Sequence, residues 1–411
     1  MKIAIVNYRY FIEGGPERYL FNIIEILQAH GHEVVPFSIK NSRNKTTPYE
    51  KYFLESVDDE VRYDKSTKSP AKIIKSFSRM FYSLEAKRKF RRFLEDTRPD
   101  IIYIIHWHNK ISPSILDVAN SMGIKVVHRL SDFQYVCPNA LLYTNGHICE
   151  QCIEGHSSLC VSQKCVLGSR VLSGVKLAAM KFHNLIGVKK KISAFVVPSS
   201  FTISRLIKGG MEANKMHHIP TFFNIKENNP DVEYGDYFLF LGRLTPQKGL
   251  ETLVKAFSGT NYKLKIAGAA PNDGFDKKLM QSLEGVEHNI EFLGHKDFDG
   301  LRPLLRQCRA TIVPSEWYDN FPNVILESFG YKKAVIASDC GSLPEAVVDG
   351  VTGLTFKTAD PADLRTKVAM LADDEALARK LGENAWQRVN TDYSPETHYR
   401  KLMQLFKSLL N

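Results

Sequence analysis

Residues 312–327 read IVPSEWYDNFPNVILE, which is an apolar run, a polar loop and then a helical pattern that begins near Asn323. The first backbone N–H groups of a helix have no partner inside the helix and carry partial positive charge. A strand, a loop and a helix in this order form the repeating unit of α/β domains with parallel sheets. Ligands of such domains bind beyond the carboxyl ends of the strands, so we expect this loop to face a ligand.

The same unit recurs along the 411 residues of the chain, which are too many for one ordinary hydrophobic core. Continuous apolar strands that alternate with helices predict two domains, each with a parallel sheet covered on both faces. We predict an N-terminal domain over residues 1–220, a C-terminal domain over residues 221–390, and a final helix over residues 391–411 that packs back toward the first domain. The predicted strands are residues 2–7, 33–37, 101–105, 125–128, 194–197, 237–241, 263–267, 290–293, 310–313, 334–337 and 354–356.

Two carboxylates flank the start of the helix predicted in residues 312–327. Asp319 lies before the helix and Glu327 about one turn inside it, so the two can reach opposite ends of one ligand. Carboxylates that accept hydrogen bonds from paired hydroxyls are a common means of holding a ribose or pyranose ring. The alternative is that Asp319 is an N-cap-like residue and Glu327 a surface acid.

A second loop, residues 242–250, reads GRLTPQKGL and follows another apolar run. Gly242 lets the backbone turn, and Arg243 and Lys248 flank the turn before a helix. Arginine offers a planar fork to phosphate oxygens, lysine offers a mobile charge, and the helix N-terminus adds partial positive charge. This loop is a candidate diphosphate site, with ordinary solvated cations as the alternative.

A third strand-to-loop transition, residues 335–345, reads VIASDCGSLPE. Together the three stretches resemble glycosyltransferase family 4, a retaining family with the GT-B fold, in which two Rossmann-like domains face a central cleft. Its members share a Gly-Arg…Lys-Gly run, a Glu-x7-Glu motif and a Gly-Gly-x-Pro-Glu turn in this order. The resemblance implies that Arg243 and Lys248 bind the donor diphosphate and that Glu327 bonds the ribose hydroxyls. It also implies that backbone amides in the run Asn320, Phe321, Pro322 and Asn323 face the sugar and the phosphates.

The chain departs from the family pattern in two places. Asp319 stands where the first acid of the Glu-x7-Glu motif is usual, and its side chain is one methylene shorter. Gly341 and Ser342 stand where two glycines are usual. The first departure bears on the contact with the donor sugar.

The first half carries a glycine-bearing loop, residues 13–18, which reads EGGPER and follows the first strand. Gly14 and Gly15 let the backbone approach a ligand closely, and family members carry a similar loop beside the donor phosphates and the acceptor. A plain tight turn is the alternative. The loop lacks the G-x-G-x-x-G pattern, which counts against an NAD enzyme.

Histidines mark two further strand ends. His106 and His108 follow the strand predicted at residues 101–105, and the resemblance suggests that His108 contacts the donor sugar near its 6-hydroxyl. In the second half, the resemblance places the nucleotide base beside the loop at His295. The Asp297-Phe298-Asp299 run after it matches the Asp-x-Asp motif of metal-dependent transferases, but helix capping is the better interpretation. We therefore expect catalysis to need no metal or other cofactor.

Five of the seven cysteines lie within residues 137–165, namely Cys137, Cys149, Cys152, Cys160 and Cys165. Their spacing includes C-x2-C, which is frequent in zinc sites, and a reducing cytosol disfavours disulfides. We predict a structural zinc here, and the alternatives are an ordinary loop of free thiols or disulfide or redox use. The segment also resembles an insertion found in some family members.

A basic segment, residues 65–94, carries ten Lys/Arg against the single acid Glu85, with apolar residues near helical spacing. Such a segment can lie on an anionic membrane surface, where each Lys/Arg contributes about 1 kcal/mol. The alternative is a surface helix whose apolar stripe lies in the core. No recognised nucleic-acid module accompanies the charge, so no nucleic-acid partner is expected.

These features predict a retaining glycosyltransferase that moves a sugar from a UDP- or GDP-linked donor to a glycan or lipid-linked acceptor, in the synthesis of bacterial surface polysaccharide or glycoconjugate. The alternatives are a nucleotide-sugar 2-epimerase of the same fold and a non-catalytic scaffold that binds sugar nucleotides or membranes. The N-terminal residues lack a small-residue cleavage site, and no apolar run reaches about 20 residues. We therefore expect a cytoplasmic protein that works at the inner face of the membrane.

Overall fold

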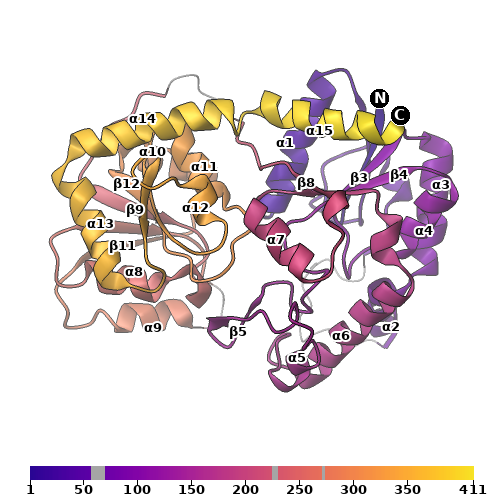
Figure 1. Ribbon diagram of the computed structural model, residues 1–411, viewed down its shortest axis with the longest axis horizontal. Coiled ribbons are helices and arrows are strands. Elements are labelled where there is room, and N and C mark those ends of the chain that lie inside the picture. The colour runs from indigo at the N-terminus through magenta and orange to yellow at the C-terminus, as the bar shows by residue number, and fades with distance from the viewer. Residues whose placement is uncertain (57–69, 225–229, 271–273) are drawn as a thin grey trace.

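Two parallel β-sheets, one in each lobe of the molecule, form its framework (Figure 1). The computed structural model describes residues 1–56, 70–224, 230–270 and 274–411. In the N-terminal lobe six strands lie in the order β2-β1-β3-β4-β7-β8. Their bounds are β1 Lys2–Asn7, β2 Glu33–Phe37, β3 Ile101–His106, β4 Lys125–Arg129, β7 Ala194–Val197 and β8 Met216–His218.

The C-terminal lobe repeats the plan, with its strands in the order β11-β10-β9-β12-β13-β14. Their bounds are β9 Tyr237–Leu241, β10 Lys263–Ala267, β11 Asn289–Gly294, β12 Ala310–Val313, β13 Val335–Ser338 and β14 Gly353–Phe356. Every pairing within the two sheets is parallel, so crossover helices cover both faces and the inner strands are mostly buried. This confirms the predicted α/β class with two parallel sheets.

Helices surround both sheets (Figure 1). In the N-terminal lobe they are α1 Gly15–Ala29, α2 Pro70–Phe81, α3 Leu84–Thr97, α4 Ser114–Ser121, α5 Leu159–Ser162, α6 Arg170–Leu185 and α7 Ser200–Lys208. In the C-terminal lobe they are α8 Leu250–Phe257, α9 Phe275–Gln281, α10 Phe298–Gln307, α11 Asn323–Gly330, α12 Leu343–Ala346, α13 Pro361–Asp373 and α14 Glu375–Thr391. None of the helices in the described parts of the chain is long and apolar enough to cross a membrane.

Each predicted strand is present, and its ends lie within one residue of the prediction. The sequence did not predict the two short strands at Tyr143–Thr144 and His147–Ile148, nor β8 at the edge of the N-terminal sheet. Its residues Met216, His217 and His218 are partly or fully exposed, so they lack the apolar signature of the buried strands. An edge strand needs only one neighbour and one covered face, so its sequence is less constrained.

The basic segment over residues 65–94 divides into two helices where it is described, and residues 65–69 lie outside the described residues. In α3, Phe90 and Phe93 are fully buried in the core, as expected for a surface helix with an apolar stripe. In α2, Met80 is buried, but Ile74 and Phe77 are 70% and 43% exposed. The alternative of a plain surface helix therefore describes α3, whereas α2 leaves apolar side chains uncovered.

The last helix, α15 Pro395–Leu410, crosses from the C-terminal lobe and lies on the N-terminal lobe (Figure 1). Its Leu402 and Phe406 are fully buried in a core that includes Leu20 of α1. His398 is also buried, and its two ring nitrogens lie 2.9 Å from the Tyr19 hydroxyl and 2.7 Å from the carbonyl oxygen of Pro220. Apolar burial and this polar anchor together fix the chain terminus to the first domain.

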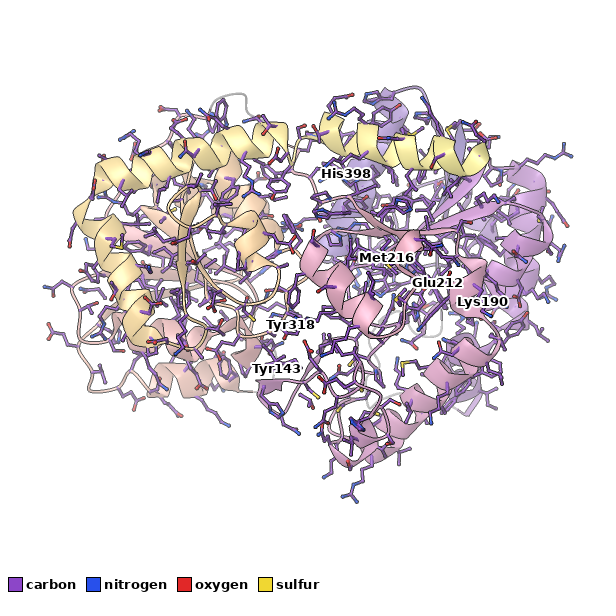
Figure 2. The ribbon with its side chains drawn as sticks, in the orientation of Figure 1. Tyr143, Lys190, Glu212, Met216, Tyr318 and His398 are labelled. Carbon is purple, nitrogen blue, oxygen red and sulfur yellow. The ribbon has the colours of Figure 1, made fainter. Side chains whose placement is uncertain are left out.

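The cysteine-rich segment lies between the lobes on the side opposite α15 (Figure 1). It contains the small antiparallel hairpin of β5 Tyr143–Thr144 and β6 His147–Ile148. The Tyr318 hydroxyl of the C-terminal lobe donates to Glu150 of this segment at 3.0 Å, and Figure 2 labels Tyr143 and Tyr318. The segment therefore contacts both domains.

We predict that His398 makes the docking of α15 sensitive to acid. Burial lowers the pKa of His398 to about 3, so the unfolded chain takes up a proton below about pH 6.5 and the folded chain does not. Stability from this residue is complete above that pH and falls as the pH drops toward the folded pKa. Between pH 7.5 and 5.5 the wild type should lose about 1.4 kcal/mol more than His398→Gln, measured by urea unfolding. Equal losses in the two proteins would contradict this origin of the acid sensitivity.

Candidate active site

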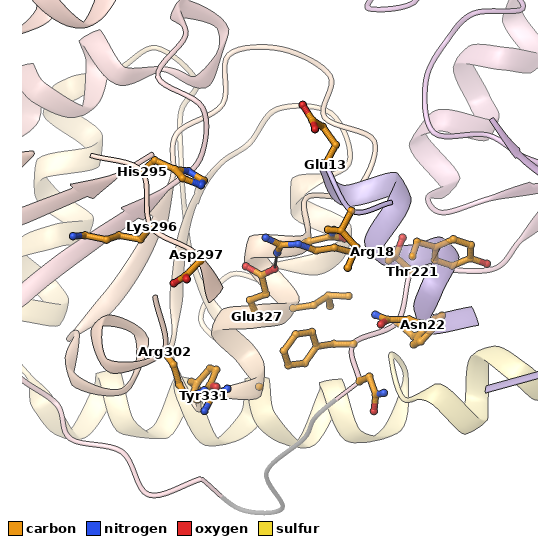
Figure 3. Close-up of a pocket in the computed structure, with 18 residues that line it drawn as sticks. Glu13, Arg18, Asn22, Thr221, His295, Lys296, Asp297, Arg302, Glu327 and Tyr331 are labelled. Atoms are coloured by element: carbon orange, nitrogen blue, oxygen red, sulfur yellow. Dashed lines mark hydrogen bonds and ion pairs between the residues drawn. The ribbon is translucent and has the colours of Figure 1, made fainter. Parts of the chain in front are cut away.

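Two adjoining cavities lie between the lobes, at the carboxyl ends of the parallel strands. The Lys248 cavity, about 410 Å³, is lined by the loop after β9, the loop after β12 and Gly15 of the first domain. The Glu327 cavity, about 520 Å³, is lined by Glu327, His295 and Arg18 (Figure 3). Asn323, the first residue of α11, lines both. The two cavities are thus neighbouring parts of one cleft around the start of α11.

The side chain of Lys248 reaches an acid at the floor of its cavity. Its ammonium donates to the Asp319 carboxylate at 2.7 Å, and Ser315 donates to the same oxygen at 2.7 Å. The ammonium also lies 5.4 Å from the Trp317 ring centre. Arg243 lines the same cavity with an exposed side chain, so both predicted phosphate ligands border one space. The ion pair with Asp319 therefore fixes the position of the Lys248 ammonium before a phosphate binds.

Glu327 is buried, at 6% exposed, and points into its cavity toward the other domain. Arg18 of α1 donates to its Oε1 at 2.9 Å (Figure 3). Burial raises the pKa of Glu327, while the Arg18 guanidinium opposes that rise. Glu327 is therefore not a surface acid, and the N-cap of α11 is Pro322, so Asp319 is not a capping residue either. Asp319 and Glu327 border different cavities, consistent with the prediction that they serve opposite ends of one ligand.

Glycines bring backbone segments together at the edge of the cleft. A side-chain carbon on Gly15 would lie 3.0 Å from Nδ2 of Asn323, so this glycine sets the approach of the first domain to α11. Gly249, at a φ of +70°, ends the predicted phosphate loop, and a side-chain carbon there would overlap the Pro314 carbonyl. Gly14 precedes α1, and its N–H donates to Glu17 at 3.0 Å. The loop at residues 13–18 is thus more than a plain turn, because it also positions Arg18 against Glu327.

The departure at Gly341 and Ser342 has a structural reason. Gly341 keeps the left-handed conformation, at a φ of +62°, that favours glycine. Ser342 needs no such freedom, at a φ of −85°, and its hydroxyl donates to the Asp319 carbonyl oxygen at 2.5 Å. The serine therefore fastens the two loops of the cleft to each other.

The histidines of the two domains lie in different places. His295 lines the Glu327 cavity with an exposed side chain. His106 and His108 line a third space, the His108 cavity, inside the N-terminal lobe. His106 Nε2 lies 3.7 Å from the Asp132 carboxylate, whereas His108 is 8% exposed and its ring lies tilted against Trp107, at 3.9 Å between ring centres. Burial and the neighbouring histidines hold the pKa of His108 well below its usual range. His108 is not among the residues that line the Lys248 cavity, and its predicted contact with the donor sugar stays a prediction.

The Asp297-Phe298-Asp299 run caps a helix. Asp297 is the N-cap of α10, and its side chain accepts from Gly300 N at 2.8 Å. Asp299 accepts from Arg302 at 3.1 Å within the same helix. The two carboxylates thus have structural partners, as the capping interpretation predicts.

The five clustered cysteines line one small cavity, with Cys137 and Cys160 buried. A hydrogen bond with the Cys152 thiol lowers the pKa of Cys137 to about 7, and burial raises the pKa of Cys160 to about 11. Among the described residues, no group of three or more His, Cys, Asp or Glu side chains is arranged to hold a metal ion. The structural zinc therefore stays a prediction, supported by the shared cavity and not by ligand geometry.

Two family models match the chain, one on each lobe. The "Glycosyl transferase 4-like domain" covers residues 14–221, and "Glycosyl transferases group 1" covers residues 222–388. The 4-like model covers just over half of the chain, so the chain belongs to the 4-like glycosyltransferases and is an enzyme of the glycosyltransferase type. The predicted family and enzyme class are confirmed.

A curated relative and two solved structures illustrate the likeness. The uncharacterized glycosyltransferase MJ1178 of Methanocaldococcus jannaschii is 33% identical over 192 residues, which are 44% of this chain and 52% of the relative. The chain spans about half the length of the curated relatives it matches. Sucrose-phosphate synthase from Thermosynechococcus elongatus has a TM-score of 0.71 at 18% identity, with 99% of this chain and 98% of the other covered. Anabaena HepE, solved with UDP and glucose, has a TM-score of 0.63 at 16% identity, with 99% and 100% covered. These likenesses show the GT-B fold.

Three residues that join the two domains, Arg18, Glu345 and Tyr318, have contacts that the sequence did not predict. Arg18 contacts Glu327, and Glu345 accepts hydrogen bonds from the backbone N–H groups of Ser200 and Phe201 at the start of α7. Arg18 is the last residue of the EGGPER loop, and Glu345 is the last residue of the VIASDCGSLPE stretch, so both lie in motifs that the sequence shows. Their partners lie more than 100 residues away, and no pattern in one sequence identifies such pairs.

We predict that metal analysis of a cysteine variant distinguishes a structural zinc site from a loop of free thiols. With zinc, the purified chain should contain about one metal ion by mass spectrometry, and Cys152→Ser should lose most of it. Cys308→Ser is the matched control, because Cys308 is buried in the other domain. Free thiols without stoichiometric zinc in the wild type would contradict the zinc assignment.

Proposed function

We propose that this glycosyltransferase takes its sugar from a UDP- or GDP-linked donor and transfers it with retention to a glycan or lipid-linked acceptor. The observation that carries the proposal is the cleft in which the Lys248 and Glu327 cavities adjoin at the start of α11. The Lys248 cavity has cations that suit a diphosphate, and the Glu327 cavity has a buried carboxylate that suits the ribose of a nucleoside. Together the two cavities suit a nucleoside diphosphate. The HepE structure with UDP and glucose supports a donor of this kind.

The nucleoside would occupy the Glu327 cavity. The Glu327 carboxylate can accept hydrogen bonds from the ribose hydroxyls, and the loop at His295 borders the space for the base. A volume of about 520 Å³ suits a ligand of this size. Asn22 of the first domain and Thr221 at the domain boundary line the far wall, so binding would join both lobes (Figure 3).

The diphosphate and sugar would occupy the Lys248 cavity. Arg243 and Lys248 lie there with the run from Asn320 to Asn323, which ends at the N-terminus of α11. A helix N-terminus and two cations stabilise the negative charge that develops on a leaving phosphate. Lys248 would exchange part of its contact with Asp319 for a phosphate oxygen. Asp319, anchored by Ser315, is then free to accept from a sugar hydroxyl.

The transfer needs no strong base on the protein. The bond between the anomeric carbon and the phosphate oxygen breaks, and a bond from the acceptor oxygen to the same carbon forms on the same face. The departing phosphate oxygen takes the proton of the acceptor hydroxyl, and the nucleoside diphosphate leaves. A role in bacterial surface polysaccharide or glycoconjugate synthesis is consistent with an acceptor that is a glycan or is attached to lipid.

Substitutions in the two cavities test this proposal. Lys248→Ala and Glu327→Ala should each lower turnover at least tenfold, because each removes a contact with the leaving group or its ribose. Lys255→Ala is the matched control, since Lys255 is an exposed lysine on the helix that follows the phosphate loop. Release of nucleoside diphosphate from UDP- and GDP-sugars is the measurement. Near-normal turnover in both variants would refute the assignment.

A contact with an anionic membrane surface is a further part of the proposal. Helix α2 lies beside α6, with the Phe81 and Phe182 rings 6.0 Å apart. The exposed apolar side chains on the two helices are Ile74 and Phe77 of α2, and Val171, Leu172 and Leu185 of α6. Lys75, Arg170 and Lys181 lie on the same helices. An apolar face bordered by cations is typical of a surface that rests on anionic lipid.

Vesicle sedimentation tests the membrane contact. The wild type should bind phosphatidylglycerol vesicles at low salt and release them at high salt, because mobile ions screen the attraction. The double variant Ile74→Glu/Phe77→Glu should bind at least fivefold more weakly. The double variant Val351→Glu/Met370→Glu is the control, because these residues are 47% and 42% exposed on the C-terminal lobe. Equal loss in both double variants, or binding that salt does not change, would contradict the contact.

A further inference from the structure

The His108 cavity lies within the N-terminal domain. It has a volume of about 380 Å³ and lies between the loops that follow β3 and β4 on one side and α6 on the other. Its lining includes His106, His108, Asp132, Lys176 and Lys189. The proposed donor site uses the other two cavities, and the donor reaches this one only through the predicted contact of His108 with its sugar.

The His108 cavity borders the Lys248 cavity. Asp132, Ala140 and Leu141 line both. Asp132 is paired with His106 at 3.7 Å, so a carboxylate and an imidazole stand at the boundary. A hydroxyl held at this boundary would lie beside the space that the donor sugar occupies.

Positive charge dominates the lining of the His108 cavity. Lys176 of α6 and Lys189 both line it, and Asp132 is the carboxylate among its lining residues. Burial, with repulsion from Lys110, lowers the pKa of Lys176 to about 8, and burial also lowers the pKa of Lys189. Two ammonium groups drawn partly out of water would be stabilised by a bound anion.

His108 forms part of the buried wall of the cavity. It is 92% buried, and its Nδ1 atom is buried without a hydrogen-bond partner among the described residues. Because this atom has almost no accessible surface, the polar side chains that a ligand can meet in the cavity are those of His106, Asp132, Lys176 and Lys189.

Part of the lining is apolar. Val166, Leu167, Ala179 and Met180 contribute to it, and Leu167 is 74% exposed, which places it at the mouth. The outer side of α6 carries the exposed Val171 and Leu185. A ligand that combines an anionic group with an apolar chain would therefore find both kinds of surface here.

We propose that the His108 cavity binds the acceptor through a phosphate group, which Lys176 and Lys189 hold while its reacting hydroxyl lies at His106 and Asp132. This inference rests on the proposed function and adds the chemical class of the acceptor, a phosphate or diphosphate ester. The phosphate can belong to a lipid-linked or to a soluble acceptor. Because the mouth of the cavity is apolar, a lipid-linked phosphate is expected to bind more tightly than a soluble one.

Calorimetric titration of the full chain tests the inference. UDP is added first to saturation, so that the cations of the Lys248 cavity are occupied, and inorganic pyrophosphate or farnesyl diphosphate is then titrated. Lys176→Met should weaken the binding of both probes at least tenfold, and Lys189→Met should weaken it in the same direction. Lys181→Met is the matched control on the same helix, because Lys181 is exposed and does not line the cavity; its affinity should change less than twofold.

The outcomes separate this inference from the proposed function. Failure of the wild type to bind UDP or any other nucleoside diphosphate counts against the proposed donor site. Normal UDP binding by Lys176→Met shows that the variant is folded. If it then binds the probes as the wild type does, if Lys181→Met weakens them equally, or if the wild type binds neither, the inference is wrong. Tighter binding of farnesyl diphosphate than of pyrophosphate supports a lipid-linked source, and equal binding supports a soluble one.

Discussion

The cleft depends on a buried carboxylate that needs a partner. Glu327 is 6% exposed, and the free-energy cost of burying an isolated carboxylate is several kcal/mol. Arg18 of the other domain provides a partner at 2.9 Å, and burial still raises the pKa of Glu327. Because the partner comes from the other lobe, the same contact links the two domains. A nucleoside that offers two hydroxyls to Glu327 would strengthen this arrangement.

Other contacts of the 312–345 region extend the link between the domains. Glu345 accepts from two backbone N–H groups at the start of α7, which have no partner within that helix. Asn320 accepts from Thr202 at 2.7 Å, and Tyr318 donates to Glu150 of the cysteine-rich segment. The loops that form the donor cleft therefore also hold the lobes together, so donor binding and lobe arrangement are expected to be coupled.

Much of the fold could be predicted from the sequence, because parallel strands buried on both faces are continuous apolar runs. The loops at residues 242–250 and 312–327 were recognisable because glycines, cations and acids stand at fixed distances there. The pairs Arg18–Glu327 and Lys248–Asp319 could not be predicted, since they join residues 309 and 71 positions apart. The cavity residues Lys176 and Lys189 could not be predicted from the sequence either. Lys176 lies in α6, which has the pattern of an ordinary amphipathic helix, and Lys189 follows that helix. The cavity that both line depends on the packing of three segments. β8 was missed because a short edge strand needs no apolar run.

The most direct test of the central claim, that the two adjoining cavities form a nucleotide-sugar site, is a panel of nucleotide sugars scored by the thermal unfolding of the purified chain. A ligand that binds only the folded state stabilises it by about 2.7 kcal/mol at one hundred times its Kd. We predict that a UDP- or GDP-linked sugar raises the Tm markedly and that the free sugar does not. A panel in which no nucleotide sugar changes the Tm would contradict the claim.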